Sequence, residues 1–121
     1  MKLIKIVNAY NAVEELSKTD GLTIIGKWSL YKVRKDISSH YEFYVQECQN
    51  LISGYKVEVN GSNVTFESAD LAKEYKTKQN DIDNLEIDVQ AVKQDVKLSD
   101  IPNITVQQIE TLDEFIEFKP E

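Results

Sequence analysis

The longest helical pattern in the chain is residues 24–53, IIGKWSLYKVRKDISSHYEFYVQECQNLIS. No proline interrupts this stretch, and Gly54 follows it as a helix stop. About 28 helical residues span about 42 Å, which is long for a domain of 121 residues, so we expect one end to project. The apolar side chains form two neighbouring stripes, which predicts packing against more than one element. These stripes are Leu30, Val33, Ile37, Tyr44 and Leu51, and beside them Tyr41, Val45, Cys48 and Ile52.

Two shorter helices are predicted on either side of this stretch. Residues 3–18 repeat apolar side chains at intervals of three and four, and Gly21 follows as a stop. Ser68 can cap a third helix that continues to Leu85. The apolar stripe of the first helix is Leu3, Ile6, Tyr10, Val13 and Leu16, and that of the third is Leu71, Tyr75, Ile82 and Leu85.

The remaining segments predict short strands and one further helix. Asn60-Gly61 separates two alternating runs, 55–59 and 64–67, a pattern typical of a β-hairpin. From Leu85 the period changes to two, which predicts a strand or extended arm that runs toward Pro102. Thr105 and Gln108 form a capping box that opens a short helix, and an apolar tail, 115–118, follows it.

Together these elements predict one α+β domain over residues 1–121. It consists of an N-terminal antiparallel helical hairpin with one long helix, a small β-hairpin, a third helix and an extended, strand-like C-terminal segment with a short helix. The length suits one compact core, and 41% apolar residues can fill it. No window of the sequence is apolar enough to span a bilayer, and no signal peptide is recognised, so we expect a cytoplasmic protein in its host cell.

Few residues could carry catalysis or hold a metal ion. His40 and Cys48 are the single histidine and cysteine of the chain, and on one straight helix they lie about 12 Å apart, too far to act as a pair. Asp81 could begin a calcium loop, but Glu86 and Val92 stand where such a loop needs Gly and Glu. We therefore expect no catalytic residues, no metal and no cofactor.

Charge divides the chain into two unequal halves. Residues 1–56 hold 8 basic and 6 acidic side chains, whereas residues 57–121 hold 6 basic and 15 acidic ones, and the net charge is −7. This balance argues against direct binding to a phosphate backbone. A dense carboxylate surface could instead imitate the phosphates of a duplex and occupy a basic channel on a partner protein. The residues predicted for that surface are Asp81, Asp83, Glu86, Asp88, Asp95 and Asp100.

A basic and aromatic cluster on the long helix is the alternative partner-binding site. It comprises Trp28, Tyr31 and Arg34, with Lys27, Lys32 and Lys35 beside them. Residues of these types are enriched at binding hot spots. The other interpretation places Trp28 and Tyr31 in the helical core with the cations at its edge, and it is the one that the sequence favours.

Several of these segments also resemble those of a known group of proteins. They are residues 6–12 (IVNAYNA), the pair Tyr41 and Tyr44, residues 96–101 (VKLSDI), and Ile109, Leu112 and Phe115–Glu117 near the end. In this order they resemble an uncharacterised family of short phage and prophage proteins of Gram-positive bacteria. The resemblance implies an origin in a phage or mobile element, and it brings no active-site residues with it.

The expected function is therefore contact with another protein. The leading hypothesis is a non-enzymatic phage or prophage protein that inhibits a host nucleic-acid-handling or defence complex, in the manner of an anti-CRISPR protein, through its acidic surface. Its partner would be a host or phage protein, with no direct contact to nucleic acid or membrane. The alternative is a virion or tail-assembly component, a possible homo-oligomer in which the long helix and Phe115–Phe118 pack against other copies.

Overall fold

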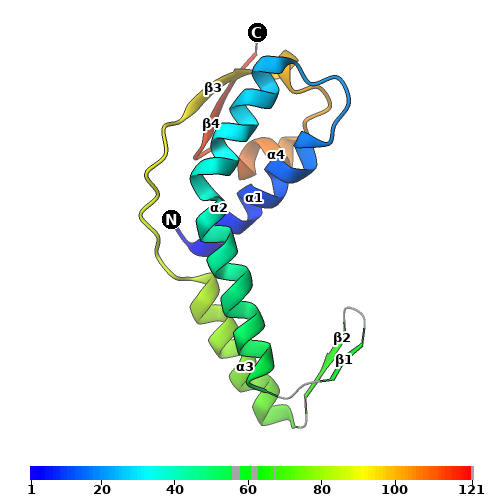
Figure 1. The fold of residues 1–121 in the computed structure, drawn as a ribbon, viewed down its shortest axis with the longest axis vertical. Helices are drawn as coiled ribbons and strands as arrows, with labels where there is room; N and C mark the ends of the chain where they lie inside the picture. The colour runs from blue at the N-terminus through cyan, green and yellow to red at the C-terminus, as the bar shows by residue number, and fades with distance from the viewer. Residues whose placement is uncertain (56–57, 61–62, 67, 121) are drawn as a thin grey trace.

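The computed structural model describes residues 1–55, 58–60, 63–66 and 68–120 and shows a mixed, helix-rich fold (Figure 1). The three predicted longer helices and the short fourth one are present where the sequence places them. In chain order the elements are α1 (Leu3–Ser17), α2 (Ile24–Ser53), β1 (Glu58–Asn60), β2 (Asn63–Thr65), α3 (Ala69–Asp83), β3 (Gln94–Lys97), the 3-10 helix η1 (Leu98–Asp100), α4 (Val106–Thr111) and β4 (Ile116–Lys119).

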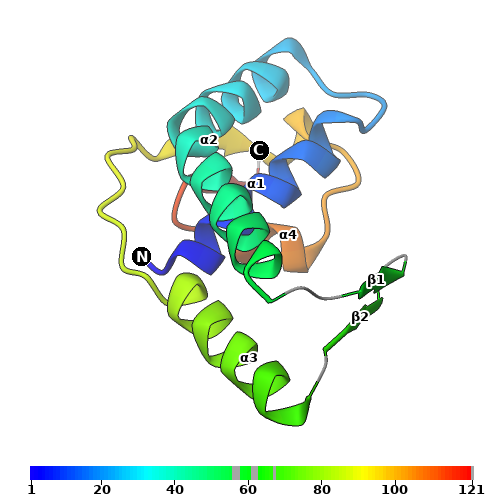
Figure 2. The same cartoon turned by 60° about the horizontal axis from the view of Figure 1, so that its bottom comes forward.

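One hydrophobic core lies at the end of the molecule where α1, the first half of α2 and the C-terminal segment meet, and we call this part the head (Figure 1). Helix α4 lies beside α1, as the turned view also shows (Figure 2). Residues from every layer of the head are completely or almost completely buried: Ile6, Val13 and Leu16 of α1, Leu30, Val33 and Ile37 of α2, and Val96, Ile101, Leu112, Phe115 and Ile116 after them.

The second half of α2 leaves the head and packs against α3, and we call this pair of helices the arm (Figure 1). The expected projecting end of the long helix is therefore confirmed, as is its packing against more than one neighbour. None of the residues of α3, all of which are described (69–83), is buried. The predicted core positions Tyr44 and Leu51 are accordingly only half-buried.

The C-terminal segments form a small sheet that the sequence pattern did not predict. Strand β3 pairs in parallel with β4, from Gln94 opposite Ile116 to Lys97 opposite Lys119. The connection through η1 and α4 returns the chain to the same end of the sheet, as parallel pairing requires. Phe115 and Ile116, expected in an apolar tail, are buried because this pairing draws the tail into the core.

The small hairpin near the tip of the arm is described only in part. Strand β1 pairs antiparallel with β2, with Val59 opposite Val64. Gly61, on which the predicted turn depends, lies outside the described residues, and so do residues 56–57 and 67 at the ends of the predicted strands.

An extended segment, residues 86–93, joins the arm to β3 along the side of the head, and we call it the strap (Figure 1). Its side chains alternate as predicted, with Ile87, Val89 and Ala91 packed against the core. Only the start of the strap is paired with another segment. There the Met1 carbonyl accepts a hydrogen bond of 2.9 Å from the N–H of Ile87. The predicted strand is thus mostly extended chain beside a helix, and regular pairing begins at Gln94.

Candidate protein-binding site on helix α2

The first turn of α2 is fixed to the head by Thr23 and Gly26. The Thr23 hydroxyl oxygen accepts a hydrogen bond of 3.0 Å from the N–H of Gly26 and so caps the helix. The same hydroxyl donates to Asp100 Oδ1 at 2.8 Å. A Cβ atom on Gly26 would lie 2.3 Å from the Asp100 carbonyl oxygen, so a glycine is needed for this close approach. These contacts hold the first turn of α2 against the C-terminal segment of the head.

The opposite side of the first half of α2 exposes large apolar side chains, which we call the α2 face. Their exposed fractions are 79% for Ile24, 59% for Ile25, 56% for Trp28 and 43% for Tyr31. Trp28 and Tyr31 stack on each other, with ring centroids 5.5 Å apart and planes 21° apart. The interpretation that places both aromatics in the core is therefore wrong. Leu30, Val33 and Ile37 fill the core from the other stripe of the helix.

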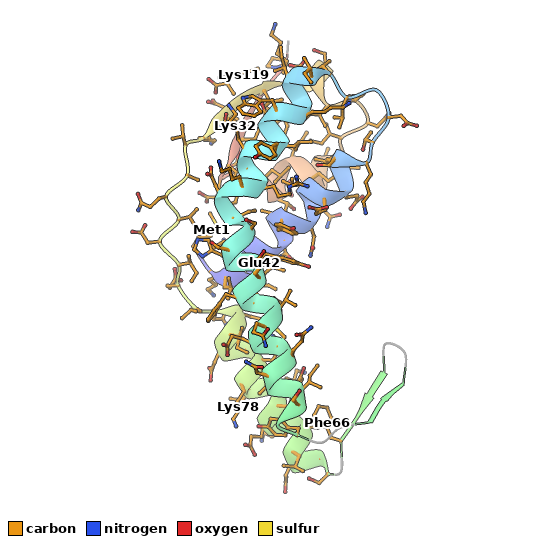
Figure 3. The ribbon with its side chains drawn as sticks, in the orientation of Figure 1. Met1, Lys32, Glu42, Phe66, Lys78 and Lys119 are labelled. Atoms are coloured by element: carbon orange, nitrogen blue, oxygen red, sulfur yellow. The ribbon has the colours of Figure 1, made fainter. Side chains whose placement is uncertain are left out.

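Cations surround the two aromatic rings. Lys32 Nζ lies 5.5 Å from the centroid of the Trp28 ring, and Arg34 Cζ lies 5.9 Å from that of Tyr31, both within range of cation–π attraction. Arg34 also forms an ion pair of 3.3 Å with Glu14 of α1. Arg34 therefore links α1 to the α2 face, while Lys32 stands on the upper half of α2 (Figure 3).

A groove of about 470 Å³ runs between α2 and the strap. Val92, whose side chain is 78% exposed, lies on the strap side of this groove. Ile24, Ile25 and Val92 were missed by the sequence analysis, although Ile24 precedes Trp28 by four positions and so continues its stripe. The groove is lined by Trp28, Tyr31, Lys32, Lys35 and Asp36 from α2 and by Gln90, Val92 and Gln94 from the strap and β3.

Four of the six predicted acidic residues bind groups within the chain, and three of these contacts reach another part of the fold. Asp83 accepts a hydrogen bond of 2.9 Å from the Tyr44 hydroxyl, and Asp100 accepts one from Thr23. Glu86 forms an ion pair of 3.1 Å with the α-amino group of Met1. Burial, together with the hydrogen bond to Asp83, raises the pKa of the Tyr44 hydroxyl well above its ordinary value. Asp83 thus lies between α2 and α3, where it joins the two helices of the arm.

The other three predicted acidic residues are exposed, as Glu86 also is, and stand on different elements. Asp81 lies near the end of α3, Asp88 on the strap and Asp95 on β3. Asp88 accepts a hydrogen bond of 3.1 Å from Gln90. The six carboxylates are therefore spread from the arm to the top of the head rather than gathered in one cluster (Figure 1).

His40 and Cys48 lie on the second half of α2. Both are half-buried, and Cys48 Sγ accepts a hydrogen bond of 3.3 Å from Gln79 Nε2. Within the described ranges, no three or more His, Cys, Asp or Glu side chains are grouped so that they could hold a metal ion. No helix in the described part of the chain combines the length and the apolar character that crossing a membrane requires.

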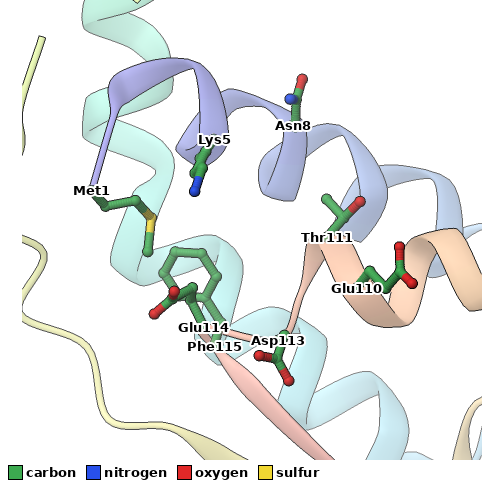
Figure 4. A pocket seen from close by; sticks show the side chains of 8 residues that line it. All are labelled: Met1, Lys5, Asn8, Glu110, Thr111, Asp113, Glu114 and Phe115. Carbon is green, nitrogen blue, oxygen red and sulfur yellow. The ribbon is translucent and has the colours of Figure 1, made fainter. Parts of the chain in front are cut away.

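A second hollow of about 310 Å³ opens between α1 and the end of α4 (Figure 4). The Phe115 ring and the Met1 side chain form its apolar part. Lys5 lines it together with three carboxylates, those of Glu110, Asp113 and Glu114. This hollow is therefore acidic overall and opposite in charge to the groove beside α2.

No protein family, curated protein or solved structure matches this chain in the three comparisons made. The resemblance to short phage and prophage proteins therefore stays a prediction.

Proposed function

We propose that this protein is a non-enzymatic accessory protein that acts by binding another protein, and that the α2 face is its contact surface. The observation that supports this most directly is the stacked pair Trp28 and Tyr31, which is about half exposed on a helix held firmly against the head. Contiguous exposed apolar side chains of this size mark interaction sites in soluble proteins.

The residue types of the α2 face suit a binding hot spot. Tryptophan, tyrosine and arginine are the residues whose loss most often weakens a protein complex. Trp28 and Tyr31 hold each other in place by stacking, and Lys32 and Arg34 approach their rings. Side chains that are already ordered lose less conformational entropy on binding than mobile ones do.

The acidic surface is the weaker candidate for the contact. Asp83, Glu86 and Asp100 are engaged within the chain, so a partner would have to compete with those contacts. The proposed role is inhibition of a host nucleic-acid-handling or defence complex, and the proposed contact with that complex is the α2 face. For the virion-assembly alternative, Phe115 and Ile116 are buried in the head and are not available to other copies.

The test is capture from a lysate of Gram-positive bacteria, followed by reconstitution with the purified captured protein. Wild type should retain a partner that the double variant Trp28→Ala, Tyr31→Ala loses. The matched control is Val106→Ala, because Val106 is 72% exposed on α4. A partner held equally well by the double variant, or lost equally by the control, would contradict the proposed contact.

A further inference from the structure

The groove beside α2 has a charge opposite to that of the whole chain. Lys32 and Lys35 line it together with one carboxylate, that of Asp36, whereas the chain carries a net charge of −7. Lys27 stands on the same part of α2 and adds one more positive charge nearby, whereas Arg34 is paired with Glu14 of α1. A concave surface with excess positive charge attracts anionic groups and steers them toward it.

The same groove also needs an apolar occupant. Trp28, Tyr31 and Val92 line it, and the Val92 side chain is 78% exposed. Their apolar surface gains free energy only if other apolar groups cover it. A ligand that satisfied the lysines alone would leave this surface in water.

These two requirements favour a polypeptide over a nucleic acid. Single-stranded nucleic acid could stack bases on Trp28 and Tyr31 and place phosphates near the lysines. However, a branched aliphatic side chain such as Val92 offers a base no stacking surface, and the net charge of −7 repels a polyanion as a whole. A peptide can alternate carboxylates with apolar side chains and so meet both needs.

Building on the proposed function, we propose that the groove between α2 and the strap takes an acidic segment of the partner protein, whose carboxylates face Lys32 and Lys35 and whose apolar side chains cover Trp28, Tyr31 and Val92. This assigns the chemistry of the partner as well as the surface it contacts. Association should then weaken as salt concentration rises, because exposed charge pairs are screened.

Trp28 provides the readout, since it is the one tryptophan of the chain and lies in the groove. The probes are three synthetic peptides and an oligothymidylate. The first peptide alternates Glu with Leu, the second replaces each Glu with Lys, and the third replaces each Leu with Ser. Only the first should shift the emission of Trp28 and bind in a saturable, salt-dependent manner.

The charge reversal Lys32→Glu, Lys35→Glu should weaken binding of the Glu-Leu peptide by about tenfold. Its matched control is Lys73→Glu, Lys76→Glu on α3, where both lysines are exposed and the change in net charge is the same. The control should stay within about twofold of wild type. The proposal would be overturned if the lysine peptide or the oligothymidylate bound as tightly as the Glu-Leu peptide. It would also be overturned if the Glu-Leu peptide caused no emission shift, or if the charge reversal did not change its binding.

Binding of the partner captured from the lysate distinguishes failure of this proposal from failure of the proposed function. If the variant of Trp28 and Tyr31 loses the partner while the reversal of Lys32 and Lys35 retains it, the α2 face binds a protein but not an acidic segment. If both lose it and the control on α3 retains it, both proposals hold.

Discussion

The hydroxyl of Tyr44 on α2 donates a hydrogen bond of 2.9 Å to the Asp83 carboxylate on α3. Gln79 donates to the same Asp83 oxygen at 3.0 Å and to the Tyr44 oxygen at 3.3 Å. These polar contacts join two helices of which the second contributes no buried residue in its described length, 69–83. The arm therefore depends on a small hydrogen-bonded network more than the head does.

The variant Tyr44→Phe should lower the free energy of unfolding by about 1 kcal/mol, because it removes this hydrogen bond from a partly buried site. The raised pKa of Tyr44 means that the folded protein holds this proton more tightly than the unfolded chain does. The stabilisation is therefore complete below about pH 10 and is lost as the pH rises through the folded-state pKa. Urea unfolding of wild type and variant at neutral and alkaline pH measures both effects. A difference between them that does not shrink as the pH rises would contradict this assignment.

The variant Gly26→Ala should lower the free energy of unfolding by about 1–3 kcal/mol, because its Cβ would meet the Asp100 carbonyl oxygen and push η1 away from α2. Gly54→Ala is the control, since the nearest atom to a Cβ there lies at 3.5 Å. It should be neutral or stabilise by about 0.5 kcal/mol. Thermal unfolding of both variants gives the comparison, and equal losses would show that the contact at Gly26 is not tight.

The two stripes of α2 should respond differently to truncation. Leu30→Ala should cost about 2–5 kcal/mol of stability, because Leu30 is 1% exposed in the core. Trp28→Ala should cost less than about 1 kcal/mol, since the ring is more than half exposed. Chemical denaturation measures both. If Trp28→Ala lowered stability as much as Leu30→Ala does, the Trp28 ring would be part of the folded core and not an exposed contact surface.

Three of the exposed acidic residues allow the two candidate surfaces to be separated. Reversal of Asp81, Asp88 and Asp95 to lysine should leave the fold intact and change the affinity for a captured partner by no more than about threefold, because they stand outside the α2 groove. Titration calorimetry at two salt concentrations measures this. A loss of affinity of tenfold or more would show that the partner contacts the acidic surface instead.

Local signals in the sequence predicted the helices well. Ser68 caps α3 by accepting from the N–H of Leu71, and Thr105 and Gln108 form both hydrogen bonds of the predicted capping box. The parallel pairing of β3 with β4 was not predictable in this way, because a strand's partner is chosen by tertiary packing and leaves no local pattern.

The sequence predicted only some residues of the candidate site, for a related reason. Leu30, Val33 and Ile37 were predicted to pack and are buried, but Ile24, Trp28 and Tyr31 add a further apolar stripe, and spacing alone did not show that this one would stay exposed. The close approach of Gly26 to Asp100, a contact between distant parts of the chain, accompanies an orientation in which Leu30 points inward and Trp28 outward.

One uninterrupted helix passes through both head and arm, and it carries the one tryptophan and the one cysteine of the chain. Trp28 and Cys48 are separated by 20 positions of this helix, or about 30 Å at 1.5 Å per residue. A dye attached to the Cys48 thiol would therefore form a donor–acceptor pair with the indole of Trp28, and energy transfer between them would report bending of the helix without any added mutation.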